Sequence, residues 1–231
     1  MRDKKIWIFN AGNAFDGNPK WLFMYIVNYR KDITPYWFCY TEETRNYIRK
    51  LGYQAFLFKS KMAEKIGSQA GVYVVNQKKD VFQDYLKGIT VLNLWHGVGC
   101  KTVEKGVTYG FLNERIIKKH IINMDCYQNY QLFLVTSPLM EKHFIKQCDL
   151  AEDKIIRAGY PCCFYPGKIK TYDHDILKQK KLPEDTKIAV YAPTYRDASA
   201  TNFFSQAIPD MEKLVDVLEK NNFLLIFKMH P

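Results

Sequence analysis

The chain has 231 residues, of which 47% are hydrophobic, enough for one large domain or two small ones with a buried core. Lysine and arginine exceed aspartate and glutamate by 34 − 24 = 10, which favours polyanionic partners such as phosphate-rich substrates, anionic lipid or nucleic acid. No apolar run reaches the roughly 20 residues that cross a bilayer. Composition therefore excludes a helical membrane span in this sequence, and we expect a cytoplasmic protein.

Strands and helices are predicted to alternate along most of the chain. A strand over 5–10 precedes a helix from Pro19 to about Tyr29, because proline suits the first helical turn and residues 21, 24, 25 and 28 recur at helical spacing. Further strands are predicted at 36–40, 55–58, 72–75, 90–94 and 132–135, and further helices at 42–51, 61–68, 111–124 and 138–147. Apolar runs without polar alternation are typical of strands covered on both faces, so we predict an α/β fold with a mostly parallel sheet.

The pattern weakens between residues 164 and 186, where prolines, a glycine and a run of lysines indicate a linker. A strand at 187–191, a helix at 209–220 and a strand at 223–228 follow. They form one βαβ unit, which is too little to bury both faces of its own sheet. We therefore expect a first domain over 1–165, a linker over 166–186 and an incomplete second domain over 187–231.

The first functional candidate is His96, in the segment Trp95-His96-Gly97 directly after the predicted strand at 90–94. Ligands of parallel α/β sheets bind beyond the carboxyl ends of strands. A histidine there can accept a proton near neutral pH, and the following lysines, Lys101 and Lys105, can hold phosphate. The alternative is a structural histidine bonded to a backbone carbonyl, with lysines that are merely solvated.

Other motifs give little support to other chemistries. Gly97-x-Gly99 lacks the third glycine of the dinucleotide fingerprint, so we expect no nicotinamide or flavin cofactor. Ser137 lacks the flanking glycines of a hydrolase nucleophile. The six cysteines show no C-x-x-C spacing and are predicted to be reduced, mostly buried thiols. Tyrosines and phenylalanines fall within apolar strands, so we expect no nucleic acid partner.

Five motifs occur in order along the chain. They are Asp16-Gly17-Asn18-Pro19-Lys20, Leu94-Trp95-His96-Gly97 with Lys101, Ile156-Arg157-Ala158-Gly159-Tyr160-Pro161 after a helix from Ser137, Ala189 to Asp197 (Ala-Val-Tyr-Ala-Pro-Thr-Tyr-Arg-Asp), and Phe227-Lys228-Met229-His230-Pro231. Together they resemble the CDP-glycerol glycerophosphotransferase family, enzymes that prime and extend teichoic-acid-type polymers. The match spans most of the chain.

The resemblance implies a GT-B-like α/β fold. An N-terminal Rossmann-like domain would handle the acceptor, and the first βαβ part of a second Rossmann-like domain would handle CDP-glycerol. The implied reaction moves glycerol phosphate, or a related polyol phosphate, from CDP-glycerol to a hydroxyl of a lipid-linked or polymer acceptor and releases CMP. The implied location is peripheral, on the anionic inner face of the plasma membrane. We expect no cofactor, because CDP-glycerol is a substrate, and the sequence leaves dependence on a divalent metal open.

By the same resemblance, His96 is the general base, and the substrate-binding residues are His230, Arg196, Thr194, Lys101 and Asn18. Open alternatives are an ion pair between Arg196 and Asp197, and a turn or helix cap at residues 16–18. The chain departs from the family in carrying Gly99 and a single lysine before Thr102, where members often carry proline and Lys-Lys.

The family's second domain also continues beyond the His-Pro motif, so we expect a fragment with weak or no activity alone. Alternative functions are a nucleotide-sugar glycosyltransferase or epimerase of the same architecture, and a non-enzymatic polyanion-binding module.

Overall fold

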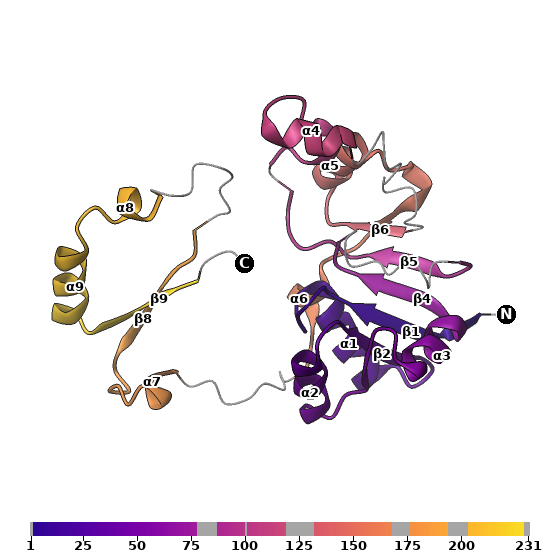
Figure 1. The fold of residues 1–231 in the computed structure, drawn as a ribbon, viewed down its shortest axis with the longest axis horizontal. Coiled ribbons are helices and arrows are strands. Elements are labelled where there is room, and N and C mark those ends of the chain that lie inside the picture. Colours follow the sequence, from indigo (N-terminus) through magenta and orange to yellow (C-terminus); the bar gives the residue numbers. More distant parts are fainter. Residues whose placement is uncertain are drawn as a thin grey trace. The chain divides into compact units, whose positions relative to one another are not determined.

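The computed structural model describes residues 2–77, 87–99, 101–118, 132–167, 176–193 and 203–228. The chain divides into two compact units, residues 1–170 and 171–231 (Figure 1). The division falls inside the segment that the sequence predicts as a linker. Within the described residues, we find no helix with the length and apolar character needed to span a membrane.

The first unit contains a seven-stranded sheet in the order β3-β2-β1-β4-β5-β6-β7, with every neighbouring pair parallel. The chain moves outward from β1 (Asp3–Asn10) to β2 (Thr34–Cys39) and β3 (Ala55–Leu57), and then returns beside β1. It continues on that side through β4 (Ala70–Val75), β5 (Thr90–Asn93), β6 (Leu132–Val135) and β7 (Ile155–Arg157). The reversal between β1 and β4 is a topological switch point, where open α/β sheets bind ligands.

The predicted strands and helices of this unit are confirmed within a few residues at their ends. The helices are α1 (Gly17–Tyr29), α2 (Glu42–Lys50), α3 (Lys61–Gln69), α4 (Phe111–Ile117), α5 (Pro138–Cys148) and the short α6 (Pro161–Phe164), with 3-10 turns η3 (Glu104–Gly106) and η6 (Glu152–Lys154). The second half of the helix predicted at 111–124 lies outside the described residues. Strand β7 was not expected, because three residues are too few to show a period.

Aromatic side chains form the centre of the core. Phe9 of β1, Phe23 of α1 and Trp37 of β2 are fully buried, and Phe23 meets the other two rings edge-on at centroid distances of 5.4 and 5.7 Å. Edge-on pairs of this kind stabilise beyond the area that they bury. The buried residues of α1 are Asn18, Pro19, Phe23, Met24 and Ile26. Of the predicted repeat at residues 21, 24, 25 and 28, only Met24 is among them, so the repeat does not follow the buried face.

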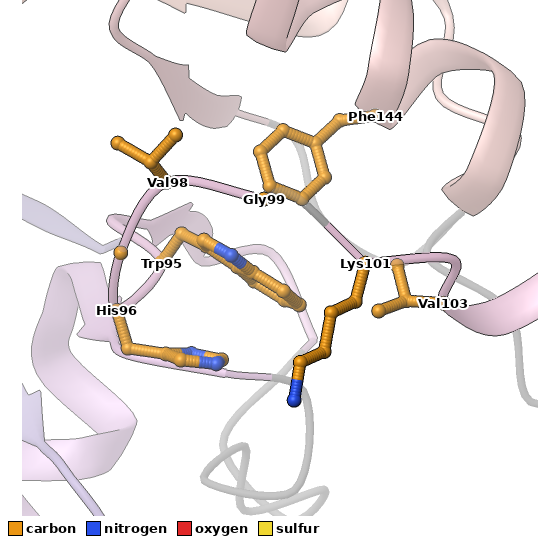
Figure 2. A pocket seen from close by; sticks show the side chains of 8 residues that line it. Trp95, His96, Val98, Gly99, Lys101, Val103 and Phe144 are labelled. Carbon is orange, nitrogen blue, oxygen red and sulfur yellow. The ribbon is translucent and has the colours of Figure 1, made fainter. Parts of the chain in front are cut away.

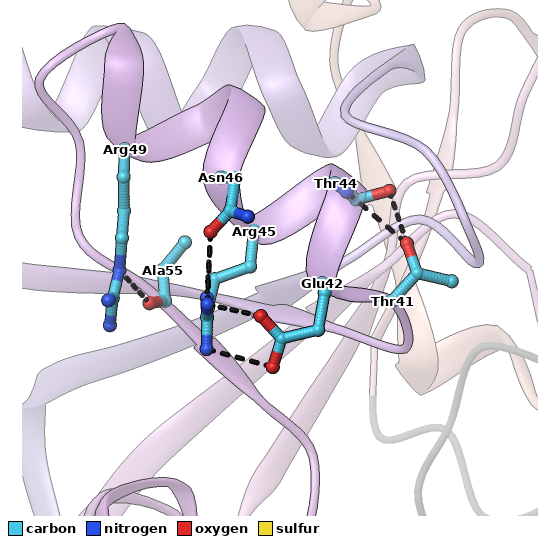
Figure 3. A network of polar contacts seen from close by, with 7 residues as sticks. All are labelled: Thr41, Glu42, Thr44, Arg45, Asn46, Arg49 and Ala55. Atoms are coloured by element: carbon cyan, nitrogen blue, oxygen red, sulfur yellow. Dashed lines mark hydrogen bonds and ion pairs between the residues drawn. The ribbon is translucent and has the colours of Figure 1, made fainter.

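The ends of α2 are set by local hydrogen bonds (Figure 3). Thr41 Oγ1 accepts a hydrogen bond from the Thr44 backbone N–H at 3.2 Å, as a helix N-cap does. Glu42 and Arg45 form an ion pair one turn apart. Arg49 Nε donates to the Ala55 carbonyl oxygen at 2.9 Å and so ties the helix to β3.

The second unit contains a parallel pair of strands, β8 (Lys187–Tyr191) and β9 (Phe223–Phe227), which confirms the predicted βαβ segment. Helix α9 (Met211–Lys220) connects them, and Asp210 Oδ1 caps it by accepting from the Lys213 N–H at 2.9 Å. The short helices α7 (Ile176–Gln179) and α8 (Phe203–Ala207) complete the described part. Only Thr186 is buried among the described residues of this unit, in keeping with a two-stranded sheet.

Candidate active site

A pocket of about 290 Å³ lies beyond the carboxyl end of β5 (Figure 2). Its walls come from the loop after that strand, apart from one ring that α5 contributes. The lining residues are Trp95, His96, Gly97, Val98, Gly99, Lys101, Val103 and Phe144. The structure thus places His96 and Lys101, both predicted from the sequence, around one cavity at the expected edge of the sheet.

Trp95 holds an uncommon backbone conformation at the start of this loop. Its φ of 55° lies in the left-handed region, which costs a bulky residue about 1–3 kcal/mol and persists only where the surroundings enforce it. The Trp95 N–H donates to Asn93 Oδ1 at 2.9 Å. The indole packs against Phe133 and Phe144 at centroid distances of 5.6 and 5.0 Å. These contacts hold Trp95, the residue that precedes His96, in place.

His96 is exposed, and its imidazole stacks on the Trp95 indole with centroids 4.3 Å apart and an interplanar angle of 29°. Its Nδ1 lies 3.4 Å from the carbonyl oxygen of Asn76, the residue that follows β4. A carbonyl oxygen only accepts, so this contact favours a hydrogen on Nδ1 and leaves Nε2 as the basic nitrogen. The ring is therefore oriented by a backbone group while remaining accessible.

The two lysines of the loop differ in their surroundings. Lys101 is exposed at the pocket, and Figure 2 shows its side chain extending past the edge of Trp95 toward the side on which His96 lies. Lys105 forms an ion pair with Asp149. The described residues give the Lys101 ammonium no ion pair of that kind, so Lys101 is the better candidate for a substrate phosphate.

Two backbone N–H groups of the loop donate hydrogen bonds to side chains of α5, and a glycine allows the close approach. The Gly99 N–H donates to Met140 Sδ at 3.2 Å, and the Val103 N–H donates to Gln147 Oε1 at 2.6 Å. A Cβ at Gly99 would lie 2.9 Å from His143 Nε2 and 3.0 Å from the Phe144 ring. Gly99, where the chain departs from the family pattern, thus lets the loop approach the side chains of the helix closely.

Asn18, predicted as a substrate-binding residue, points into the protein instead. Its side chain is 3% exposed. Its Nδ2 donates to the carbonyl oxygens of Leu94 and Trp95 at 3.3 and 3.0 Å, and its Oδ1 accepts from the Cys162 N–H at 3.4 Å. These backbone contacts occupy the amide, so direct substrate binding does not fit this arrangement. The adjacent Asp16 stands at the N-cap position of α1 but makes no side-chain capping bond.

Tyr160 is a site residue that the sequence analysis did not single out. Its hydroxyl donates to the Gly97 carbonyl oxygen at 2.6 Å, and burial raises the pKa of that hydroxyl. The Gly-Tyr-Pro motif contains it, but the motif gives no indication of which backbone group the tyrosine meets.

The cysteines only partly follow the prediction of buried thiols. Cys39 and Cys148 are buried, and burial raises the pKa of Cys39 to about 12. Cys162 and Cys163 are exposed, with sulfurs 3.8 Å apart. Exposure follows from their place on the single turn of α6, which has no buried face. Partial burial, and then the neighbouring thiol, raises the pKa of Cys162, which does not favour a reactive thiolate.

Three predicted site residues, Thr194, Arg196 and His230, lie outside the described residues. Their assignment to the donor remains a prediction.

Comparisons with known proteins agree with one family. The model of the family "CDP-Glycerol:Poly(glycerophosphate) glycerophosphotransferase" matches residues 1–231. The chain is 22% identical over 250 residues to the teichoic acid poly(glycerol phosphate) polymerase of Bacillus spizizenii, covering 99% of this chain and 60% of that protein. It is 30% identical over 105 residues to the teichoic acid glycerol-phosphate primase of the same organism, covering 46% of this chain and 27% of that protein.

Among solved structures, the wall teichoic acid polymerase TagF matches with a TM-score of 0.73 and 20% sequence identity, over 99% of this chain and 57% of that chain. At this identity the likeness establishes the fold, and it confirms the predicted GT-B-like α/β class. The chain spans between 27% and 60% of the lengths of these three relatives. Because the family model covers every residue, the chain belongs to the CDP-glycerol:poly(glycerophosphate) glycerophosphotransferase family.

Proposed function

We propose that this chain carries the acceptor-activating half of an enzyme that transfers glycerol phosphate, or a related polyol phosphate, from CDP-glycerol to a hydroxyl group in teichoic-acid-type polymer synthesis. One observation carries the proposal. The exposed imidazole of His96 is stacked on Trp95 and held through Nδ1 beside the Asn76 carbonyl, at the carboxyl edge of a parallel sheet. An oriented imidazole with a basic, accessible nitrogen is what activation of an alcohol needs.

In the proposed reaction the acceptor hydroxyl oxygen attacks the glycerol-bearing phosphorus of CDP-glycerol. A new phosphorus–oxygen bond forms, the bond to the CMP oxygen breaks, and CMP leaves. Nε2 of His96 takes the hydroxyl proton, and the hydrogen on Nδ1 supports the resulting imidazolium through the Asn76 carbonyl. Positioning and charge compensation supply most of the rate in phosphoryl transfer.

Lys101 supplies positive charge on the pocket side of the loop. Its ammonium would contact a phosphate of the donor or of a polymeric acceptor as a point charge. The prediction that Thr194, Arg196 and His230 hold the donor's phosphates belongs to the same proposal, as does the division into an acceptor domain over 1–165, a linker over 166–186 and a donor domain over 187–231. The net charge of +10 suits an anionic polymer and a peripheral position on an anionic cytoplasmic membrane surface with a lipid-linked acceptor.

The test is CMP release from CDP-glycerol, in the presence of a glycerol-phosphate-primed acceptor, by this chain joined to the downstream segment of the family's second domain. His96→Ala should lower kcat by at least about 100-fold, the usual contribution of a general base. Added imidazole should restore part of the rate, because a small base can enter the space that the side chain leaves. CMP release by His96→Ala at the parental rate would refute the assignment. Release of UDP from UDP-N-acetylglucosamine, with CDP-glycerol untouched, would favour the nucleotide-sugar alternative.

A matched pair of lysine variants tests the charge. Lys101→Ala should raise KM for the phosphate-bearing substrate by about 10-fold, which corresponds to a loss of roughly 1.4 kcal/mol in binding free energy. Lys105→Ala removes the same charge from the same loop but takes it from an ion pair with Asp149. It should leave KM within about two-fold, because its ammonium is already engaged. Equal effects of the two variants would mean that only the overall charge of the loop matters.

A further inference from the structure

We infer that Asn18 and Tyr160 are positioning residues that hold the backbone on both sides of His96. Asn18 lies in the first turn of α1, and Tyr160 directly precedes α6. Neither belongs to the loop that carries the histidine. Their consequence for catalysis rests on the proposed function, whereas their effect on the His96 ring does not.

The two side chains together bind three carbonyl oxygens of the loop backbone, those of residues 94, 95 and 97. Asn18 Nδ2 donates to the carbonyl oxygens of Leu94 and Trp95, just before His96. The Tyr160 hydroxyl donates to the carbonyl oxygen of Gly97, just after it. A left-handed residue such as Trp95 is stable only where its surroundings over-determine it, and these donors add to the Asn93 contact on the other side of the same peptide.

The chemistry of Asn18 is specific to an amide. Its NH2 group donates to two carbonyl oxygens, while its oxygen accepts from the Cys162 N–H and thereby joins α1 to α6. An aspartate of the same shape could accept from Cys162 but would set a carboxylate oxygen against two carbonyl oxygens. The side chain is 3% exposed, so water has little room to replace the lost donors.

Tyr160 acts through its hydroxyl alone. The residue is buried, and burial raises its pKa, so the hydroxyl remains protonated and available as a donor at neutral pH. Phenylalanine would keep the ring and remove the contacts of the hydroxyl with the Gly97 carbonyl and with Thr136. The Asn18→Asp and Tyr160→Phe changes therefore loosen the two sides of the His96 peptide without opening a cavity.

Loosening this backbone should act on the orientation of the imidazole. The stack on Trp95 and the contact of Nδ1 with Asn76 both require the present path of the loop. A small misplacement of a catalytic group costs about 100-fold in rate. The expected signature is a loss of kcat with little change in KM, since neither side chain faces the pocket lining.

The decisive readout is the nitrogen NMR spectrum of the imidazole, recorded on the chain with 15N-labelled histidine. The His96→Gln variant assigns the His96 signals by their disappearance. In the parent, Nδ1 should show the shift of a protonated ring nitrogen and Nε2 that of an unprotonated one. In Asn18→Asp and Tyr160→Phe, both shifts should move toward the average of the two tautomers.

Matched controls come from the exposed side of α1. Asn28 Nδ2 donates to the Tyr165 hydroxyl at 2.8 Å, so Asn28→Asp and Tyr165→Phe repeat both chemical changes away from the loop. These controls should leave the His96 signals unchanged. If Asn18→Asp proves unfolded by circular dichroism, Tyr160→Phe alone decides.

Unchanged His96 shifts in folded Tyr160→Phe and, where folded, Asn18→Asp would overturn the inference, whatever the activity. In the CMP-release assay, each variant should lose about 10- to 100-fold in kcat with KM within about two-fold. Failure of the parent, joined to the family's downstream segment, to use CDP-glycerol would instead contradict the proposed function, and the NMR result would still stand. The two failures are thus distinguishable.

Discussion

The turn after β1 and the loop after β5 leave the same edge of the sheet but have opposite roles. In the β1 turn, Asn10 is buried and bonds to the backbone of Gly12 and Phe38, and Asn18 points inward. In the β5 loop, His96 and Lys101 are exposed at a pocket. Rossmann domains commonly bind phosphate at the first of these positions. Here residues after β1 support the loop after β5, and the proposed reactive groups lie two strands away from β1.

The turn after β1 and the loop after β5 need different kinds of residue. The β1 turn requires groups that can satisfy the backbone of other segments, which an amide does with both a donor and an acceptor. The β5 loop requires the left-handed backbone at Trp95 and a rigid aromatic ring on which the histidine can stack. The two positions are complementary, because the amide of the first holds the carbonyls of the second.

The largest expected effect comes from removing the aromatic support of the β5 loop. Phe144 is fully buried against Trp95 and Phe133, so Phe144→Ala should lower the free energy of unfolding by about 3–5 kcal/mol. Leu139→Ala changes the same helix at a residue that is 72% exposed and should cost less than about 0.5 kcal/mol. Urea unfolding measures both. Similar values for the two would show that Trp95 does not depend on this helix.

Substitution of Gly17, which lies between the turn after β1 and the Asn76 carbonyl near His96, should give the next largest effect. Gly17 has a φ of 62°, and a Cβ there would lie 2.9 Å from the side chain of Asn76, whose carbonyl faces His96. Gly17→Ala should cost about 1–2 kcal/mol for the backbone and more for the contact. Gly52→Ala is the control, since Gly52 has a φ of 85° but no atom near its Cβ position. A difference between their unfolding free energies isolates the Asn76 contact, and equal costs would argue against it.

Helix capping offers a smaller and direct contrast between the two positions. Ser137 Oγ accepts from the Met140 N–H at 3.2 Å and caps α5, whereas Asp16 makes no capping bond at α1. Ser137→Ala should therefore cost about 1 kcal/mol and Asp16→Ala less. Thermal unfolding monitored by circular dichroism measures the loss of stability in both variants. An Asp16→Ala cost equal to that of Ser137→Ala would show that α1 depends on its acidic residue after all.

The smallest effect concerns pH. The Arg157 guanidinium, by hydrogen bonding first and by its charge second, holds the pKa of Glu141 below the ordinary carboxyl value of about 4.3. A carboxyl group with a depressed folded-state pKa stabilises the protein above its unfolded pKa, and this stability is lost as the pH falls through the folded pKa. Glu141→Gln should flatten the pH dependence of unfolding in that acid range and leave it unchanged near neutrality. The Glu141 carboxyl shift, followed by NMR during an acid titration, checks the pKa directly.

The sequence predicted most of the strands, because apolar runs such as Leu132 to Val135 carry their own signal. It also placed His96 correctly at a strand end, since position after a strand and residue type both indicated a site. The short β7 escaped prediction, as did the use of Lys105 in an ion pair with Asp149 on another element. Such pairings depend on which elements the fold brings together.

The role of Asn18 shows the same limit at the site. Its motif indicated importance, but the choice between binding a substrate and holding a backbone depends on partners 76 and 77 residues away. The left-handed Trp95 gave no local signal either, because a bulky aromatic is not a residue that prefers that conformation. Long-range contacts decide both cases, and one sequence does not reveal them.

The Asn18 amide bonds to residues far away in the sequence, which affects the order in which the protein folds. Its hydrogen bonds close loops of 76, 77 and 144 residues, and long loops are entropically costly to close before local structure has formed. We therefore expect the histidine to acquire its final orientation late, after the sheet has assembled and residue 162 has docked. On this view a nascent chain with a well-formed core still lacks the oriented imidazole on which the proposed function depends.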